Sequence, residues 1–310
     1  MAKNNVSLSQ QLVNEVRALL GDAYQVTEQR VLKTNVCLQG IIIKGVGEDE
    51  NNIIPQIYVE DYLQRLENGE DVTDVAKELI ATYEACRIRE EYDISWFLDY
   101  ATVKDRVCAK LINTKLNEEL LLDVPSIPFC DLSIVFYALA SMGENETGSI
   151  LIHNSHMEAW GVDILTIAKQ AMENTPKLLG CEIKGVYEIM KETLGCDDLF
   201  DEWEEDFYMS VLSTKNCSNG SILMVYAEIL DKFIAEREQK DKKTYNRVVI
   251  LPSSTHEVIL ICLEDMAEIN TLDLSEMIVS VNEECLRPIE ILSTHPYVYD
   301  KHTHTMTSIA

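Results

Sequence analysis

RVVILPSSTHEVILICL, residues 247–263, places two apolar runs on either side of a short polar turn. Each run has the length of a β-strand, and the Pro-Ser-Ser segment between them, residues 252–254, is typical of a chain reversal. The apolar side chains that follow recur at helical spacing: Leu274, Met277, Ile278, Val281 and Cys285. Residues 247–286 therefore predict a hairpin followed by a helix, a β-turn-β-α unit.

The same order of elements occurs earlier, at about residues 131–173. A dense apolar run over 132–140 precedes a turn rich in Gly and Asn, a second short run and an amphipathic stretch. Hairpins with helices between them disfavour a strictly parallel, doubly wound sheet. The sequence therefore predicts an α+β (mixed α/β) fold, in which repeated β-turn-β-α units form mixed sheets with helices packed on the sheet faces.

The first hundred residues are interpreted as a separate unit. An amphipathic helix ends at Gly21, and two extended stretches, 24–32 and 36–44, are close enough to form a hairpin around Thr34-Asn35. We expect an amino-terminal α/β unit over residues 1–101. A carboxy-terminal α/β region over residues 102–310 then contains both β-turn-β-α units.

The composition is strongly acidic, with 53 Asp and Glu against 26 Lys and Arg and a formal net charge of −27. A negative surface repels phosphate backbones and anionic lipid headgroups, which disfavours direct binding to nucleic acid or membranes. The acidic residues are spread along the chain, so they are interpreted as a solvated surface. The segment 197–206 is interpreted as a solvated linker, with a partner-docking helix as the alternative.

Several features indicate the compartment. The nine cysteines include no CxxC pair, so they are interpreted as reduced thiols, several of them in the core. The amino-terminal residues include no apolar secretory segment, and the apolar runs are shorter than the roughly 20 residues of a membrane span. We therefore expect a cytoplasmic protein.

The turn between the two strands of residues 247–263 carries the first candidate site. In an extended chain Ser254 and His256 share one face and Glu257 lies on the other, so a nucleophilic hydroxyl could meet an imidazole base. Ser254, His256 and Glu257 are therefore candidate catalytic residues of a Ser/His hydrolase. No neighbouring residue supplies an oxyanion site, and the alternative is a turn whose polar side chains bond the backbone.

A second candidate site follows the equivalent hairpin at residues 131–173. The segment His153-Asn-Ser-His156-Met-Glu158 places two imidazoles on one side of a helical turn. His153, His156 and Glu158 are candidate ligands for a divalent metal, either alone or together with His256. The alternative is that these histidines cap the helix. The sequence indicates no other cofactor.

Seven stretches together resemble an uncharacterised bacterial family, a domain-of-unknown-function family frequent in gut bacteria and their mobile elements. They are residues 53–71, 110–125, 131–140, 148–163, 174–179, 248–261 and 291–300. The resemblance covers most of the chain. It implies a bacterial cytosolic protein associated with mobile elements, and it carries over no catalytic residues.

The leading hypothesis is a non-enzymatic protein-interaction or regulatory module that binds a partner protein through its acidic surface. A metal-dependent or Ser/His hydrolase that uses the His153, His156 and His256 segments is the first alternative. An acidic mimic of nucleic acid is the second, and it requires the charge to gather on one face. The sequence does not determine the oligomeric state.

Overall fold

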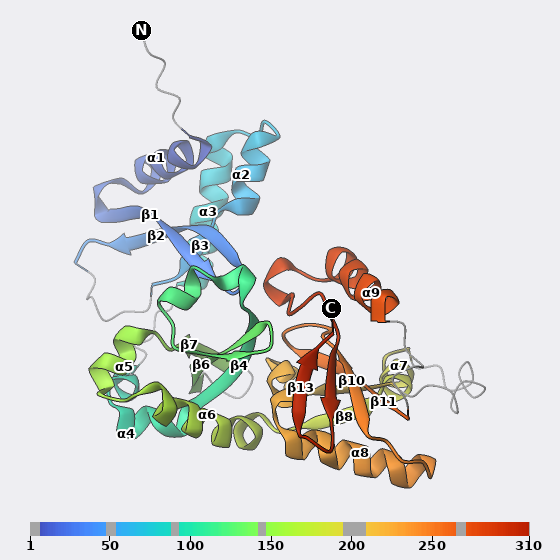
Figure 1. The fold of residues 1–310 in the computed structure, drawn as a ribbon. Coiled ribbons are helices and arrows are strands. Elements are labelled where there is room, and N and C mark those ends of the chain that lie inside the picture. The colour runs from blue at the N-terminus through green and yellow to red at the C-terminus, as the bar shows by residue number, and fades with distance from the viewer. Residues whose placement is uncertain are drawn as a thin grey trace. The chain divides into compact units, whose positions relative to one another are not determined.

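The computed structural model describes residues 7–47, 54–87, 93–141, 147–194, 209–264 and 271–309. The chain divides into two compact units, Met1–Ser95 and Trp96–Ala310. Figure 1 shows the elements of both. The acidic segment 197–206 lies outside the described residues. Within the described ranges, no helix is both long enough and apolar enough to cross a membrane.

The amino-terminal unit is a three-stranded antiparallel sheet, in the order β1-β2-β3, with its helices on one face (Figure 1). Its elements are α1 (Leu8–Leu20), β1 (Tyr24–Lys33), β2 (Val36–Gly45), β3 (Gln56–Tyr58), α2 (Glu60–Glu67) and α3 (Val72–Cys86). Buried side chains from all six form one core, among them Leu12, Val26, Ile41, Ile57, Leu66 and Leu79.

Local chemistry fixes where these elements begin and turn. The Ser7 hydroxyl accepts a backbone N–H from the first turn of α1, and the Asp71 carboxylate does the same for α3. Asn35 has a positive φ of 64° in the turn between β1 and β2, which Asn tolerates better than most residues. The predicted hairpin around Thr34-Asn35 is confirmed.

The β1–β2 hairpin is much longer than the third strand. Its two strands have ten residues each, whereas β3 has three and pairs only with Gly40–Ile42. The part of β2 nearest the turn, residues 36–39, therefore extends beyond β3. This overhang creates the pocket described below.

The carboxy-terminal unit contains two antiparallel sheets. In one, β6 pairs with β4, β5 and β7; the other has the order β13-β12-β10-β11-β9-β8. The strands are β4 (Val107–Asn113), β5 (Ser126–Phe129), β6 (Leu132–Ser141), β7 (Thr147–Leu151), β8 (Glu182–Gly185), β9 (Met209–Ser213), β10 (Arg247–Leu251), β11 (Glu257–Leu263), β12 (Tyr297–Asp300) and β13 (Thr305–Ser308). The helices are α4 (Tyr100–Val103), α5 (Asn154–Trp160), α6 (Ile164–Leu179), α7 (Val186–Leu194), α8 (Ala227–Asp241) and α9 (Thr271–Cys285).

Both faces of the six-stranded sheet are covered. Val248 and Ile250 of β10 face a large core that includes α6, α8 and the four-stranded sheet, whereas Val249 and Leu251 pack with Ile278 of α9. A strand buried on both faces needs apolar side chains at successive positions, as residues 248–251 have. The predicted α+β class is confirmed, and both predicted hairpins, β6–β7 and β10–β11, are present.

Candidate functional site

The two histidines of the predicted metal site lie at the start of α5. His153 is the residue before the helix, and its backbone N–H donates to Nδ1 of His156 at 3.0 Å. Nδ1 of His153 lies 2.7 Å from Oδ2 of Asp123. The imidazole of His156 also packs edge-on against Phe97, with 4.9 Å between the ring centroids. These contacts give both rings a role in anchoring the helix, while the predicted third ligand, Glu158, is exposed.

The position of His156 predicts a pH effect on stability. Burial lowers its pKa; His153 acts in the same direction and Asp123 in the opposite one. A histidine whose pKa is lower in the folded state than in the unfolded state takes up a proton when the chain unfolds at acidic pH. Its contribution to the free energy of unfolding is therefore fully present above about pH 6.5, the unfolded-state pKa, and is lost as the pH falls. We therefore expect the free energy of unfolding of the unmodified chain to fall more steeply than that of His156→Gln as the pH is lowered from about 8 to about 5.

The measurement is urea unfolding of both proteins across that pH range. Glutamine keeps an acceptor for the His153 N–H but does not titrate, so the comparison separates protonation from capping. Equal pH dependence of the two free energies of unfolding would contradict the expected effect.

The Ser254–His256 segment is tied into backbone hydrogen bonds. The His256 N–H donates to the Ser254 hydroxyl at 3.0 Å, and Nδ1 of His256 accepts the N–H of Asn219 at 3.2 Å. Nε2 of His256 faces Oε1 of Glu290, 3.9 Å away. A nucleophilic pair requires the serine hydroxyl to donate to a ring nitrogen. Here the two ring nitrogens are directed toward Asn219 and Glu290.

The third predicted catalytic residue is directed elsewhere. Oε1 of Glu257 accepts a hydrogen bond from the Ser253 hydroxyl at 3.3 Å, while the backbone carbonyl of Glu257 accepts from Ser254. In the described residues, no group of three or more His, Cys, Asp or Glu side chains is arranged to hold a metal ion. Catalysis at Ser254 and metal binding at His153 both stay predictions.

Sequence reasoning missed Glu290, the acid that faces His256. The Arg287 side chain hydrogen-bonds Glu290 and lowers its pKa, and His256 adds a smaller effect of the same sign. Thr255, next to His256, donates its N–H to the Glu290 carbonyl. The sequence offered only one signal for Glu290, its position just before residues 291–300, one of the stretches that resemble the family. No local pattern connects Glu290 with the turn at residues 252–257.

A second missed group surrounds Asp131, which lies in the turn between β5 and β6. Oδ1 of Asp131 accepts from the Tyr297 hydroxyl at 2.6 Å, and Oδ2 accepts from the Ser293 hydroxyl at 3.0 Å. Nε2 of His295 lies 3.5 Å from the same Oδ2. Ser293 and His295 each contact Asp131 directly. In a catalytic triad, by contrast, the histidine lies between the serine and the acid. The group connects the two sheets.

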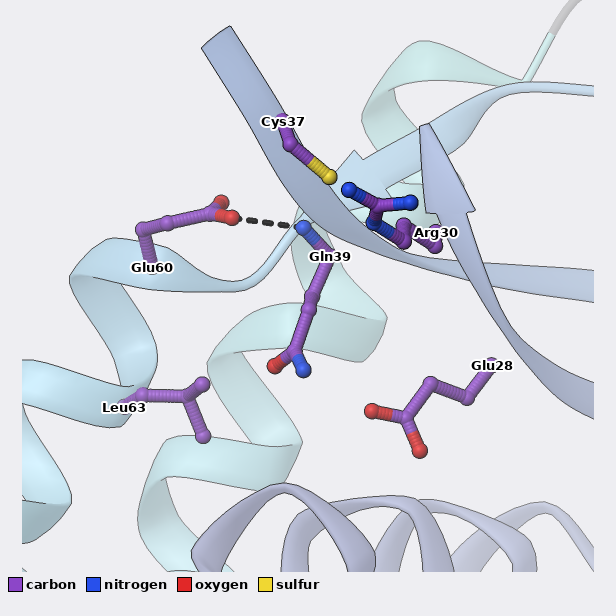
Figure 2. A pocket seen from close by; sticks show the side chains of 6 residues that line it. All are labelled: Glu28, Arg30, Cys37, Gln39, Glu60 and Leu63. Atoms are coloured by element: carbon purple, nitrogen blue, oxygen red, sulfur yellow. Dashed lines mark hydrogen bonds between the residues drawn. The ribbon is translucent and has the colours of Figure 1, made fainter. Parts of the chain in front are cut away.

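The amino-terminal unit contains an open pocket of about 580 Å³ beside the overhang of the β1–β2 hairpin (Figure 2). We call it the hairpin pocket. It is lined by Glu28, Arg30, Cys37, Gln39, Glu60 and Leu63.

Strand alternation explains why the strand residues line this pocket. Glu28 and Arg30 are two apart on β1, as are Cys37 and Gln39 on β2, and the register places Arg30 opposite Gln39. The same face of β2 continues into the core at Ile41. The inner face of the sheet is therefore apolar under the helices and polar where the hairpin extends beyond them.

Two of the carboxylates are held in place. Oε1 of Glu60, the first residue of α2, accepts the backbone N–H of Gln39 at 2.6 Å (Figure 2). The Ser9 hydroxyl of α1 donates to Glu28. Both acids are nevertheless exposed, so they can reach a ligand. The pocket combines two carboxylates, a guanidinium, a thiol and the apolar side chain of Leu63.

A family model described as "Family of unknown function (DUF5688)" matches residues 7–301. No curated protein and no solved structure matches the chain.

Proposed function

Because the chain belongs to the DUF5688 family of unknown function, we propose its function from its geometry: it is a protein-interaction module whose hairpin pocket receives a basic side chain of a partner protein. The observation that carries the proposal is the placement of the Glu28 and Glu60 carboxylates in one open pocket. Opposite charges across an interface favour association and fix its orientation.

The charge of the whole chain supports a basic partner. A net charge of −27 raises the association rate of a positively charged partner and repels acidic ones. Within the pocket, Leu63 offers an apolar surface to the methylene groups of a lysine or arginine side chain. The lining therefore suits a protein segment better than a simple cation.

The histidine segments give less support to the hydrolase alternative. His153, His156 and His256 each use a ring nitrogen in a contact that anchors the fold. The Ser254 hydroxyl accepts a backbone N–H. Polar side chains with such partners are ordinary structural features. The hairpin pocket, by contrast, presents exposed charged groups.

The proposal predicts that one carboxylate of the pocket matters for binding. We expect Glu28→Gln to weaken the partner complex about fivefold, because an exposed ion pair contributes up to about 1 kcal/mol. Glutamine keeps an acceptor for the Ser9 hydroxyl. The full chain is immobilised, partners from a lysate of the source organism are identified by mass spectrometry, and their affinity is then measured.

Glu67→Gln is the matched control, since Glu67 is an exposed acid at the end of α2, the helix that begins with Glu60, and lies outside the pocket. Both variants lose one negative charge, so a general electrostatic effect would weaken both equally. Binding that is the same for Glu28→Gln and Glu67→Gln would refute the assignment of the hairpin pocket.

A further inference from the structure

One side of β2 is open where the hairpin extends beyond β3. Residues 36–38 pair with β1 on one side. On the other side, the pairing with β3 covers only Gly40–Ile42, and no described strand continues it toward the turn. An unpaired strand edge exposes backbone donors and acceptors that another chain can use.

The hydrogen bonds of Gln39 show which groups lie on that open side. Its carbonyl accepts the N–H of Val59 at 3.0 Å, and its own N–H donates to Glu60. The backbone groups of Gln39 therefore point away from β1. Alternate residues of an antiparallel strand point the same way, so the N–H and C=O of Cys37 also point away from β1.

We infer that this edge of β2 accepts an added strand: an extended segment of the partner protein pairs with residues 36–38 and places a basic side chain in the hairpin pocket. The inference rests on the proposed function and names its binding mode. Strand addition to a sheet edge is a recurring way to recognise peptides, in which backbone hydrogen bonds give affinity and pockets for alternate side chains give specificity.

The pocket fits this arrangement because of its position along β2. A residue that pairs directly with Cys37 has its side chain on the same face of the sheet as Cys37. That face carries Glu28 and lies next to Glu60 (Figure 2). The flanking residues of the segment point to the opposite face. The segment is therefore expected to need one Lys or Arg, with no basic requirement at its two neighbours.

The first test removes the donor of Cys37. The probe is a basic peptide selected on the full chain from a displayed library of seven-residue peptides, with affinity measured by fluorescence polarisation. We expect Cys37→Pro to weaken binding about tenfold, because proline lacks the N–H and its ring crowds the added strand. The matched variant Cys37→Ser keeps the N–H and reports what the Cys37 side chain contributes, so strand addition predicts that Cys37→Pro weakens binding clearly more than Cys37→Ser does.

Proline at residue 37 leaves the β1–β2 ladder intact, because the N–H that it removes points away from β1. A second measurement does not depend on the folding of that variant. Each amide of the peptide is methylated in turn and tested on the unmodified chain. Strand addition predicts that methylation weakens binding at alternate positions, because only every second N–H faces β2.

The outcomes separate the inference from the function on which it rests. One outcome overturns strand addition but keeps the pocket: Glu28→Gln weakens binding, whereas Cys37→Pro has no effect and methylation of the peptide shows no alternation. Affinity unaffected by Glu28→Gln overturns the proposed function itself. Pocket-dependent capture of a partner without any selectable peptide also overturns strand addition. If the chain forms an oligomer that Cys37→Pro dissociates, the added strand comes from a second copy of this chain, and the inference of a separate partner protein is overturned.

Discussion

Gly220→Ala is expected to destabilise the carboxy-terminal unit by about 3 kcal/mol, the upper end of the usual cost of overpacking. A Cβ at residue 220 would lie 2.4 Å from the carbonyl oxygen of His256, 2.6 Å from the Ser213 hydroxyl and 2.7 Å from the Ser213 Cα. The Gly220 N–H and the Ser213 hydroxyl both donate to that carbonyl. Backbone must therefore move, and these hydrogen bonds weaken together.

The measurement is urea unfolding followed by tryptophan fluorescence. All three tryptophans lie in the carboxy-terminal unit, so this signal reports on that unit. Gly185→Ala is the control, because a Cβ at residue 185 meets nothing within 4 Å. We expect the control to change the free energy of unfolding by less than about 1 kcal/mol. Equal midpoints for the two variants would contradict the close packing at Gly220.

Asp131→Ala is expected to destabilise the same unit by about 2–4 kcal/mol, because it leaves two buried hydroxyls without their acceptor. Tyr297 and Ser293 are both fully buried, and each donates to one oxygen of Asp131. Burial raises the pKa of Tyr297, and the hydrogen bond to Asp131 acts in the same direction. The phenol therefore stays protonated and keeps its need for an acceptor.

A double-mutant cycle tests this contact directly. Tyr297→Phe removes the donor, so Asp131→Ala should cost less in that background, with a coupling energy of about 1 kcal/mol or more. Glu173→Ala serves as the control, since Glu173 is an exposed acid within α6. Unfolding of Asp131→Ala at the same urea concentration as Glu173→Ala would show that the carboxylate does not hold the two hydroxyls.

The sequence allowed the main elements of the fold to be predicted because the side chains repeat with the period of each element. Residues 248–251 are apolar at successive positions, and the structure covers both faces of β10. The helix with Leu274 and Ile278 was predicted from helical spacing and is α9. The order of the strands could not be predicted, because residue patterns do not specify which strands become neighbours.

The candidate site depended on those unknown neighbours. Local alternation put Ser254 beside His256, but Asn219 and Glu290 determine where the ring nitrogens point. Both come from segments distant in the sequence. The hairpin pocket was partly predictable, since alternation places Glu28 and Arg30 on one face of the predicted hairpin. The position of α2 against that face was not.

The bond between Asp131 and Tyr297 has a consequence for synthesis on the ribosome. It joins residues that are far apart in the chain, and β12 pairs with β10 in the middle of the six-stranded sheet. Such a topology has a high contact order, which slows folding. The carboxy-terminal unit therefore cannot complete its core until Tyr297 and the rest of β12 have emerged. The amino-terminal unit, which ends at Ser95, can fold while the following residues are still being made.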